Sequence, residues 1–227
     1  MTTTSSPVAP TETNSRARQV AGVLRLTAGA VLAVALGFQI VEKVVNNDMI
    51  PQEYFSYFTV QSAMINIVVL LVGGVLALRY RSDTVLYTTI RMSAVAYAIV
   101  TAVVYNVLLR GIPDEGFVVT PWPGEIMHVW IPIFFTLDWL LSPGRPALRW
   151  TALRVAISYP IAWVAFTLVR GAIDGWFPYP FLEFSTGFVN VATYVVGIAG
   201  FIIAIAALAI WYSRVRDRVP MSSAVTA

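Results

Sequence analysis

Six long apolar segments dominate this sequence and decide what it can fold into. Each is close to the length of about 20 residues that an α-helix needs to cross the roughly 30 Å hydrocarbon core of a bilayer. A backbone inside lipid must satisfy its own hydrogen bonds, so isolated spans of this kind form helices. We therefore predict an all-α integral membrane bundle of six transmembrane helices, at residues 19–41, 57–79, 87–109, 125–142, 152–170 and 190–212.

The composition excludes several classes of protein and site. The chain is 58% hydrophobic and only 12% charged, which is more apolar sequence than a soluble domain can bury. It has no cysteine, which rules out disulfides, thiolate metal ligands and cysteine nucleophiles. It has a single histidine, which rules out a multi-histidine metal site. We predict no cofactor, no metal and no nucleic-acid partner, and the sequence indicates no particular oligomeric state.

Polar tails flank the apolar region. Residues 1–18 are rich in Ser, Thr and Pro and predict a disordered cytoplasmic tail, and residues 214–227 predict a basic cytoplasmic tail. Residues 19–213 form the transmembrane domain between them. The first apolar run is too long for a signal peptide and lacks a clear small-residue cleavage site, so we interpret it as a helix.

Basic residues are distributed unequally between the two sides of the predicted bundle, and this sets its orientation. Three fall on one side, at Lys43, Arg110 and Arg170. Nine fall on the other, at Arg16, Arg18, Arg79, Arg81, Arg145, Arg149, Arg214, Arg216 and Arg218. Short loops rich in arginine stay in the cytoplasm, so we predict that both termini are cytoplasmic and that the protein is a multi-pass protein of the cell membrane.

A first polar layer is predicted near the outer surface. Thr59, Ser62 and Asn66 follow an i, i+3, i+7 pattern and share one helix face. His128, the only histidine, is expected at the same depth as Thr59. A hydroxyl beside an imidazole suggests a nucleophile and its base. Taken singly, however, Thr59 can bond its own helix and His128 can join two helices.

Two further amides belong to this layer. Asn106 ends the third span and Asn190 begins the sixth, both at the outer level. Such amides most often make helix-packing contacts. In an acyl-transfer site they could instead donate to a developing oxyanion.

A second polar layer is predicted near the cytoplasm. Asp138 lies close to the inner end of the fourth span, and Arg25, Arg91 and Arg154 lie in the first turns of outward-running helices. A carboxylate at this depth is costly unless it is paired. We interpret the four residues as a structural ion-pair layer; the alternative is a proton or ion site at Asp138.

Four segments carry a resemblance to a known family. They are YFSYFTVQS (54–62), MHVWIPIFFTLDWLL (127–141), SYPIAWVAFTLVRG (158–171) and WFPYPFLE (176–183). The chain resembles a bacterial family of predicted six-transmembrane proteins over most of residues 20–212. That family is distantly similar to the androgen-induced and androgen-dependent TFPI-regulating proteins of eukaryotes, which are intramembrane threonine hydrolases.

The resemblance implies an activity. By motif, Thr59 would be the nucleophile and His128 the catalytic histidine of a lipid-ester hydrolase near the outer leaflet, acting on fatty acid esters of hydroxy fatty acids or similar fatty-acyl esters. The alternative from a different class is a non-enzymatic membrane regulator, lipid-binding protein or small transporter. A rhomboid-type protease is excluded because the sequence has no Gly-x-Ser-Gly segment.

Overall fold

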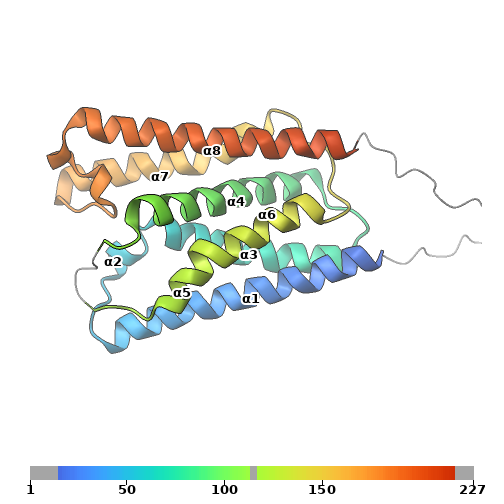
Figure 1. Cartoon of the computed structure of the whole chain (residues 1–227), viewed down its shortest axis with the longest axis horizontal. Coiled ribbons are helices and arrows are strands. Elements are labelled where there is room, and N and C mark those ends of the chain that lie inside the picture. Colours follow the sequence, from blue (N-terminus) through green and yellow to red (C-terminus); the bar gives the residue numbers. More distant parts are fainter. Residues whose placement is uncertain (1–14, 113–116, 218–227) are drawn as a thin grey trace, which may run out of the picture.

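The computed structural model describes residues 15–112 and 117–217 as helices joined by short connections. Six helices in this part of the chain are long and apolar enough to cross a membrane, as the sequence predicts. They are Arg16–Val45, Phe58–Arg79, Val85–Leu109, Pro121–Leu141, Ala152–Asp174 and Phe188–Val215. In the labels of Figure 1, these spans are α1, α3, α4 with η1, α5 with η2 and α6, α7, and α8.

Two of the six spans are compound. The third consists of α4 (Val85–Val104) and the π-helical η1 (Tyr105–Leu109). The fourth consists of α5 (Pro121–Glu125), the π-helical η2 (Ile126–Trp130) and α6 (Ile131–Leu141). The other elements are α1 (Arg16–Val45), α2 (Pro51–Tyr54), α3 (Phe58–Arg79), α7 (Ala152–Asp174), η3 (Pro180–Leu182), η4 (Phe184–Thr186) and α8 (Phe188–Asp217).

The bundle has two chemically different ends (Figure 1). At one end α1 begins, α8 ends, and the connections 80–84 and 142–151 pass between helices; we call this the arginine-rich end. At the other end lie α2, η3, η4 and the connections 46–57 and 175–187; we call this the aromatic end. Within the bundle, α4 packs against α3, α6, α7 and α8.

The terminal helices are longer than the sequence predicts. Helix α1 begins at Arg16, where Ser15 caps it by accepting a hydrogen bond from the Arg18 N–H. Residues 16–18, assigned above to a disordered tail, are therefore helical, and Arg18 is buried. Helix α8 continues to Asp217, four residues into the predicted basic tail. The remaining tail predictions concern residues 1–14 and 218–227, which lie outside the described residues.

Glycines let α1 and α3 approach closely. A Cβ atom on Gly22 would lie 3.0 Å from the carbonyl oxygen of Gly74, and one on Gly74 would lie 2.9 Å from that of Gly22. The two helices therefore cross backbone to backbone, the small-residue packing that replaces the hydrophobic effect between helices in lipid.

Two prolines inside helices leave carbonyl groups that neighbouring side chains satisfy. Proline has no N–H, so it cannot bond the carbonyl four residues earlier. Pro160 in α7 leaves the carbonyl of Ala156, which accepts from the Tyr97 hydroxyl at 2.8 Å. Pro132 in α6 leaves the carbonyl of His128, which accepts from the Asn106 amide at 3.2 Å. Both donors belong to the span that runs through the centre of the bundle.

Candidate functional site

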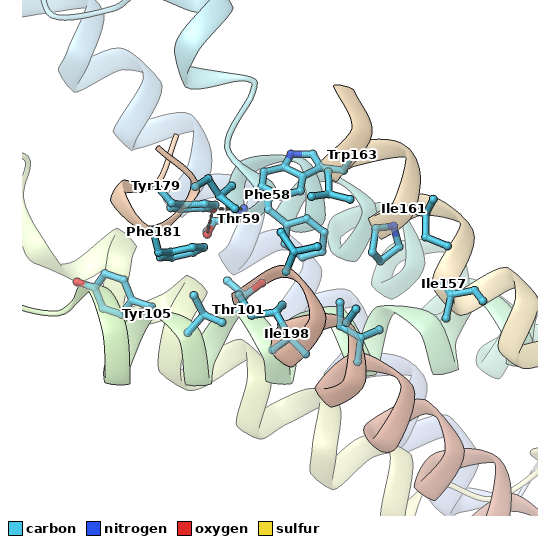
Figure 2. Close-up of a pocket in the computed structure, with 18 of the residues that line it drawn as sticks. Phe58, Thr59, Thr101, Tyr105, Ile157, Ile161, Trp163, Tyr179, Phe181 and Ile198 are labelled. Carbon is cyan, nitrogen blue, oxygen red and sulfur yellow. Dashed lines mark hydrogen bonds between the residues drawn. The ribbon is translucent and has the colours of Figure 1, made fainter. Parts of the chain in front are cut away.

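A pocket of about 150 Å³ lies between α4, α7 and α8, towards the aromatic end (Figure 2). Its walls are almost entirely aliphatic and aromatic side chains, as expected for a lipid chain or another apolar ligand. The polar atoms in the wall come from two threonines and three aromatic residues with a polar group: Thr59, Thr101, Tyr105, Trp163 and Tyr179. Ile157 and Ile161 from α7 and Ile198 from α8 are among its aliphatic wall residues.

Thr59 sits in the first turn of α3 and presents a half-buried side chain to this pocket. The N–H groups in the first turn of a helix have no partner within that helix. The Thr59 N–H donates instead to the Tyr179 hydroxyl at 3.4 Å, and the two hydroxyl oxygens are 3.5 Å apart. Tyr179 comes from the connection between α7 and α8. Burial raises the pKa of Tyr179, so its phenol stays protonated and can donate to Thr59.

His128 lies in η2 and is 9% exposed. Its Nδ1 atom is 2.8 Å from the carbonyl oxygen of Gly124. A carbonyl only accepts hydrogen bonds, so Nδ1 carries the proton. In the neutral ring, Nε2 then has a free lone pair, the form that a general base requires. The local backbone has thus fixed the tautomer of this histidine.

Tyr105 connects the surroundings of His128 with the pocket. Its ring stacks on the imidazole of His128, with centroids 3.7 Å apart and planes 15° from parallel. It also lines the pocket, together with Thr59. Within the described residues no hydrogen bond joins Thr59 to His128, and His128 is not among the residues that line the pocket. The two predicted catalytic residues are therefore not in contact, and Tyr105 is the residue that both stacks on His128 and lines the pocket of Thr59.

The structure places the other residues predicted for the outer layer in different surroundings. Ser62 and Asn66 are buried and line a second, much smaller cavity behind Thr59. The side chain of Asn106 is already engaged: its amide donates to the carbonyls of Ala102 and His128, and its oxygen accepts from Arg110. It has no free donor directed at the pocket, which corrects its assignment as an oxyanion donor.

Asn190 also departs from the prediction. It lies in the first turn of α8, its side chain is exposed, and it does not line the pocket. Its place at a helix start beside the aromatic end agrees with the predicted span. The sequence could not give its direction, because α8 is apolar around its whole circumference and no stripe shows which side faces inward.

The second polar layer is a charge cluster at the arginine-rich end. Arg25 Nε is 3.0 Å from the Asp138 carboxylate, and an Arg91 nitrogen is 2.7 Å from it. Ser142 donates to the same carboxylate. Arg154 takes no part: it is exposed in the first turn of α7, where a long side chain can reach the membrane surface. Its assignment to this layer is therefore corrected.

Two members of the charge cluster were not predicted. Asp83 lies in the connection between α3 and α4 and is fully buried. It accepts from Arg18 at 2.5 Å and Arg91 at 3.2 Å, and it lies 3.8 Å from Arg25. Arg18 is the second member that was not predicted. Asp83 and Arg18 both lie at the ends of membrane spans, where charged residues normally face water. The cluster thus contains three arginines and two aspartates: Arg18, Arg25, Arg91, Asp83 and Asp138.

The fold and pocket together define a class: a six-helix multi-pass membrane protein with an apolar pocket beside a threonine hydroxyl. No protein-family model matches the sequence, and neither the curated proteins nor the solved structures include a significant match. In residues 15–112 and 117–217, no group of three His, Cys, Asp or Glu side chains is placed to hold a metal ion.

Proposed function

We propose that this protein binds an acyl chain of a lipid ester in the Thr59 pocket and hydrolyses the ester. The observation that carries the proposal is an apolar pocket between membrane-length helices with the Thr59 hydroxyl in its wall. An acyl chain fits such walls because they offer it few polar groups. The resemblance of the Thr59 and His128 segments to intramembrane threonine hydrolases supports the same activity.

The reaction would proceed through an acyl-enzyme. His128 Nε2 takes the proton of the Thr59 hydroxyl, and the threonine oxygen forms a bond to the ester carbonyl carbon. The tetrahedral intermediate collapses, the bond to the alcohol oxygen breaks, and the alcohol leaves with the proton from His128. The base must come within about 3 Å of the hydroxyl, so the reaction requires a rearrangement that brings the His128 ring to Thr59.

The orientation and location of the protein belong to the same proposal. The arginine-rich end would face the cytoplasm of a bacterial cell, in keeping with the distribution of basic residues. The pocket would then lie in the outer half of the cell membrane. Fatty acid esters of hydroxy fatty acids, with two acyl chains, are a substrate class that could enter from the lipid between α7 and α8.

A second candidate function is non-catalytic lipid binding. It is favoured by one contact: Thr59 bonds Tyr179, a phenol that cannot act as a base at neutral pH, rather than His128. Both candidates use the same pocket, so a photoactivatable fatty acid should crosslink to peptides of α7 or α8 in either case. Crosslinking only outside this pocket would contradict both.

A fluorophosphonate probe separates the two candidates. Such probes react with activated serine or threonine hydroxyls. If the protein is a hydrolase, the wild type in membranes is labelled, and labelling is lost in Thr59→Ala and in His128→Ala. Thr193→Ala is the matched control, because the Thr193 hydroxyl is exposed on α8 and bonds only its own helix. An unlabelled wild type that still crosslinks to the fatty acid would leave lipid binding as the function.

A further inference from the structure

The second cavity lies behind Thr59 and differs from the pocket in its chemistry. It has a volume of about 10 Å³. Five of its wall residues are apolar: Leu32, Ala63, Ala98, Met127 and Ile131. The other four are polar, and they come from one face of α3 and the facing side of α4: Thr59, Ser62, Asn66 and Thr101. Thr59 and Thr101 also line the apolar pocket, so these two threonines separate the two spaces.

The polar groups of this cavity are incompletely satisfied. Asn66 is 4% exposed, and its Oδ1 atom is buried with no hydrogen-bonding partner among the described residues. The Ser62 hydroxyl donates to the Thr59 carbonyl at 3.0 Å and lies 3.5 Å from the Thr101 hydroxyl, at the limit of a hydrogen bond. A buried acceptor without a donor is costly, and inside a membrane bulk water does not correct it.

We propose that this cavity is a binding site for a single water molecule. A water molecule needs a space of roughly 10–15 Å³ by this measure and usually makes two to four hydrogen bonds. Here it would donate to Asn66 Oδ1 and bond the hydroxyls of Ser62 and Thr101. These groups suit water better than a cation, because the side-chain oxygens in the wall are few and none of them is charged. The space is too small for any part of a lipid headgroup.

The position of this site gives the water a role, which rests on the proposed hydrolysis. Deacylation of acyl-Thr59 needs one water molecule, and the apolar pocket is a poor source of it. The water oxygen would bond to the acyl carbonyl carbon while one of its protons passes to His128 Nε2. The bond from that carbon to Thr59 Oγ1 then breaks, the threonine oxygen takes the proton from His128, and the carboxylic acid leaves.

Hydroxyl-radical footprinting tests the water site without any activity. Synchrotron radiolysis of an ordered water makes radicals in place, and methionine beside it is oxidised to the sulfoxide. Met127 lines the cavity and is 6% exposed, whereas Met92 is fully buried on α4 and lines neither space. We expect Met127 in the detergent-solubilised full chain to be oxidised several-fold faster than Met92. We expect this difference to disappear in Thr101→Val and in Asn66→Leu, which keep the side-chain shape.

Two results would overturn the site. One is Met127 oxidation as slow as that of Met92 in the wild type. The other is fast Met127 oxidation that persists in both variants, because radicals would then reach Met127 by another route. Two variants are used so that a folding defect in one leaves the other informative.

The role of the water has its own readout. With a medium-chain p-nitrophenyl ester, Asn66→Leu should keep the initial burst of p-nitrophenolate and lose most of the steady-state rate, because Asn66 lines only the small cavity, and acylation needs no water whereas deacylation does. A wild-type steady-state rate in this variant would overturn the role. If the wild type shows neither burst nor turnover, the proposed hydrolysis fails, while footprinting still decides the water site.

Discussion

The two ends of the bundle solve the problem of polar groups in a membrane in opposite ways. At the arginine-rich end, three buried arginines and two buried aspartates bond one another and connect α1, α4, α6 and the α3–α4 connection. Near the aromatic end, the N–H and the hydroxyl of Thr59 each make one long hydrogen bond, both to the Tyr179 hydroxyl, beside a pocket with apolar walls.

The difference shows where the molecule can change shape. A buried charge cluster is tolerable only when it is complete, because a single lost partner leaves an uncompensated charge. The side-chain contacts at the arginine-rich end must therefore be kept in any change of shape. Apolar walls between α7 and α8 have no such constraint, since lipid tails replace one apolar contact with another at little cost. The charge cluster therefore holds its helices in register, whereas the helices around the pocket are held together by apolar packing.

The largest expected effect comes from breaking the charge cluster. Asp138→Asn removes the anion that Arg25 and Arg91 share. We expect the free energy of unfolding to fall by about 3–5 kcal/mol, because two buried cations lose one of the two carboxylates beside them and three buried arginines are left with one aspartate. Thermal unfolding in detergent or nanodiscs measures the loss. Arg154→Gln is the control, since Arg154 is exposed outside the cluster, and its stability should equal that of the wild type. Equal losses in both variants would contradict the role of the charge cluster in stability.

A medium effect is expected where α4 supports α7. Tyr97→Phe keeps the ring and removes the donor to the Ala156 carbonyl. A buried acceptor left without a donor costs about 1–3 kcal/mol. The same change in a Pro160→Ala background should cost less, because the helix then supplies its own N–H to that carbonyl. A double-mutant cycle measures this coupling, and strictly additive losses would refute it.

The smallest stability effect is expected beside the pocket. Tyr179→Phe removes two long hydrogen bonds to Thr59 and should lower the free energy of unfolding by only about 0.5–1.5 kcal/mol. If the hydrolase proposal holds, the freed Thr59 should react with the fluorophosphonate probe at least as fast as in the wild type. A stability loss as large as that of Asp138→Asn would mean that the pocket end is as rigid as the charged end.

Span length and charge were enough to predict much of the fold. Six apolar runs gave six helices, and the position of Asp138 on α6 gave a residue that needs cationic partners. The sequence could not show which side of each helix faces the interior of the bundle. Arg91 and Arg154 both lie within the first two turns of their helices, yet only Arg91 contacts the charge cluster. Helix α7 has few buried residues and no apolar stripe to show which face turns inward.

The site was predictable only where helical periodicity applies. Thr59, Ser62 and Asn66 were expected on one face of α3, and the small cavity lies along that face. Tyr179 was not anticipated, because it reaches Thr59 from an irregular connection 120 residues away. The sequence did contain one usable signal: a proline inside a helix frees a carbonyl. Pro132 frees the carbonyl of His128. A search for a donor to that carbonyl would have separated Asn106 from the candidate oxyanion donors.

The pairing of prolines with donors also has a consequence for how the chain is made. In lipid, each unsatisfied carbonyl costs several kcal/mol, so the helices that contain Pro132 and Pro160 are poorly stable alone. Their donors, Asn106 and Tyr97, both precede them in the sequence. During synthesis, the third span therefore enters the membrane before either helix that depends on it. Each proline-containing helix can be completed as it leaves the translocon, against a partner that is already in place.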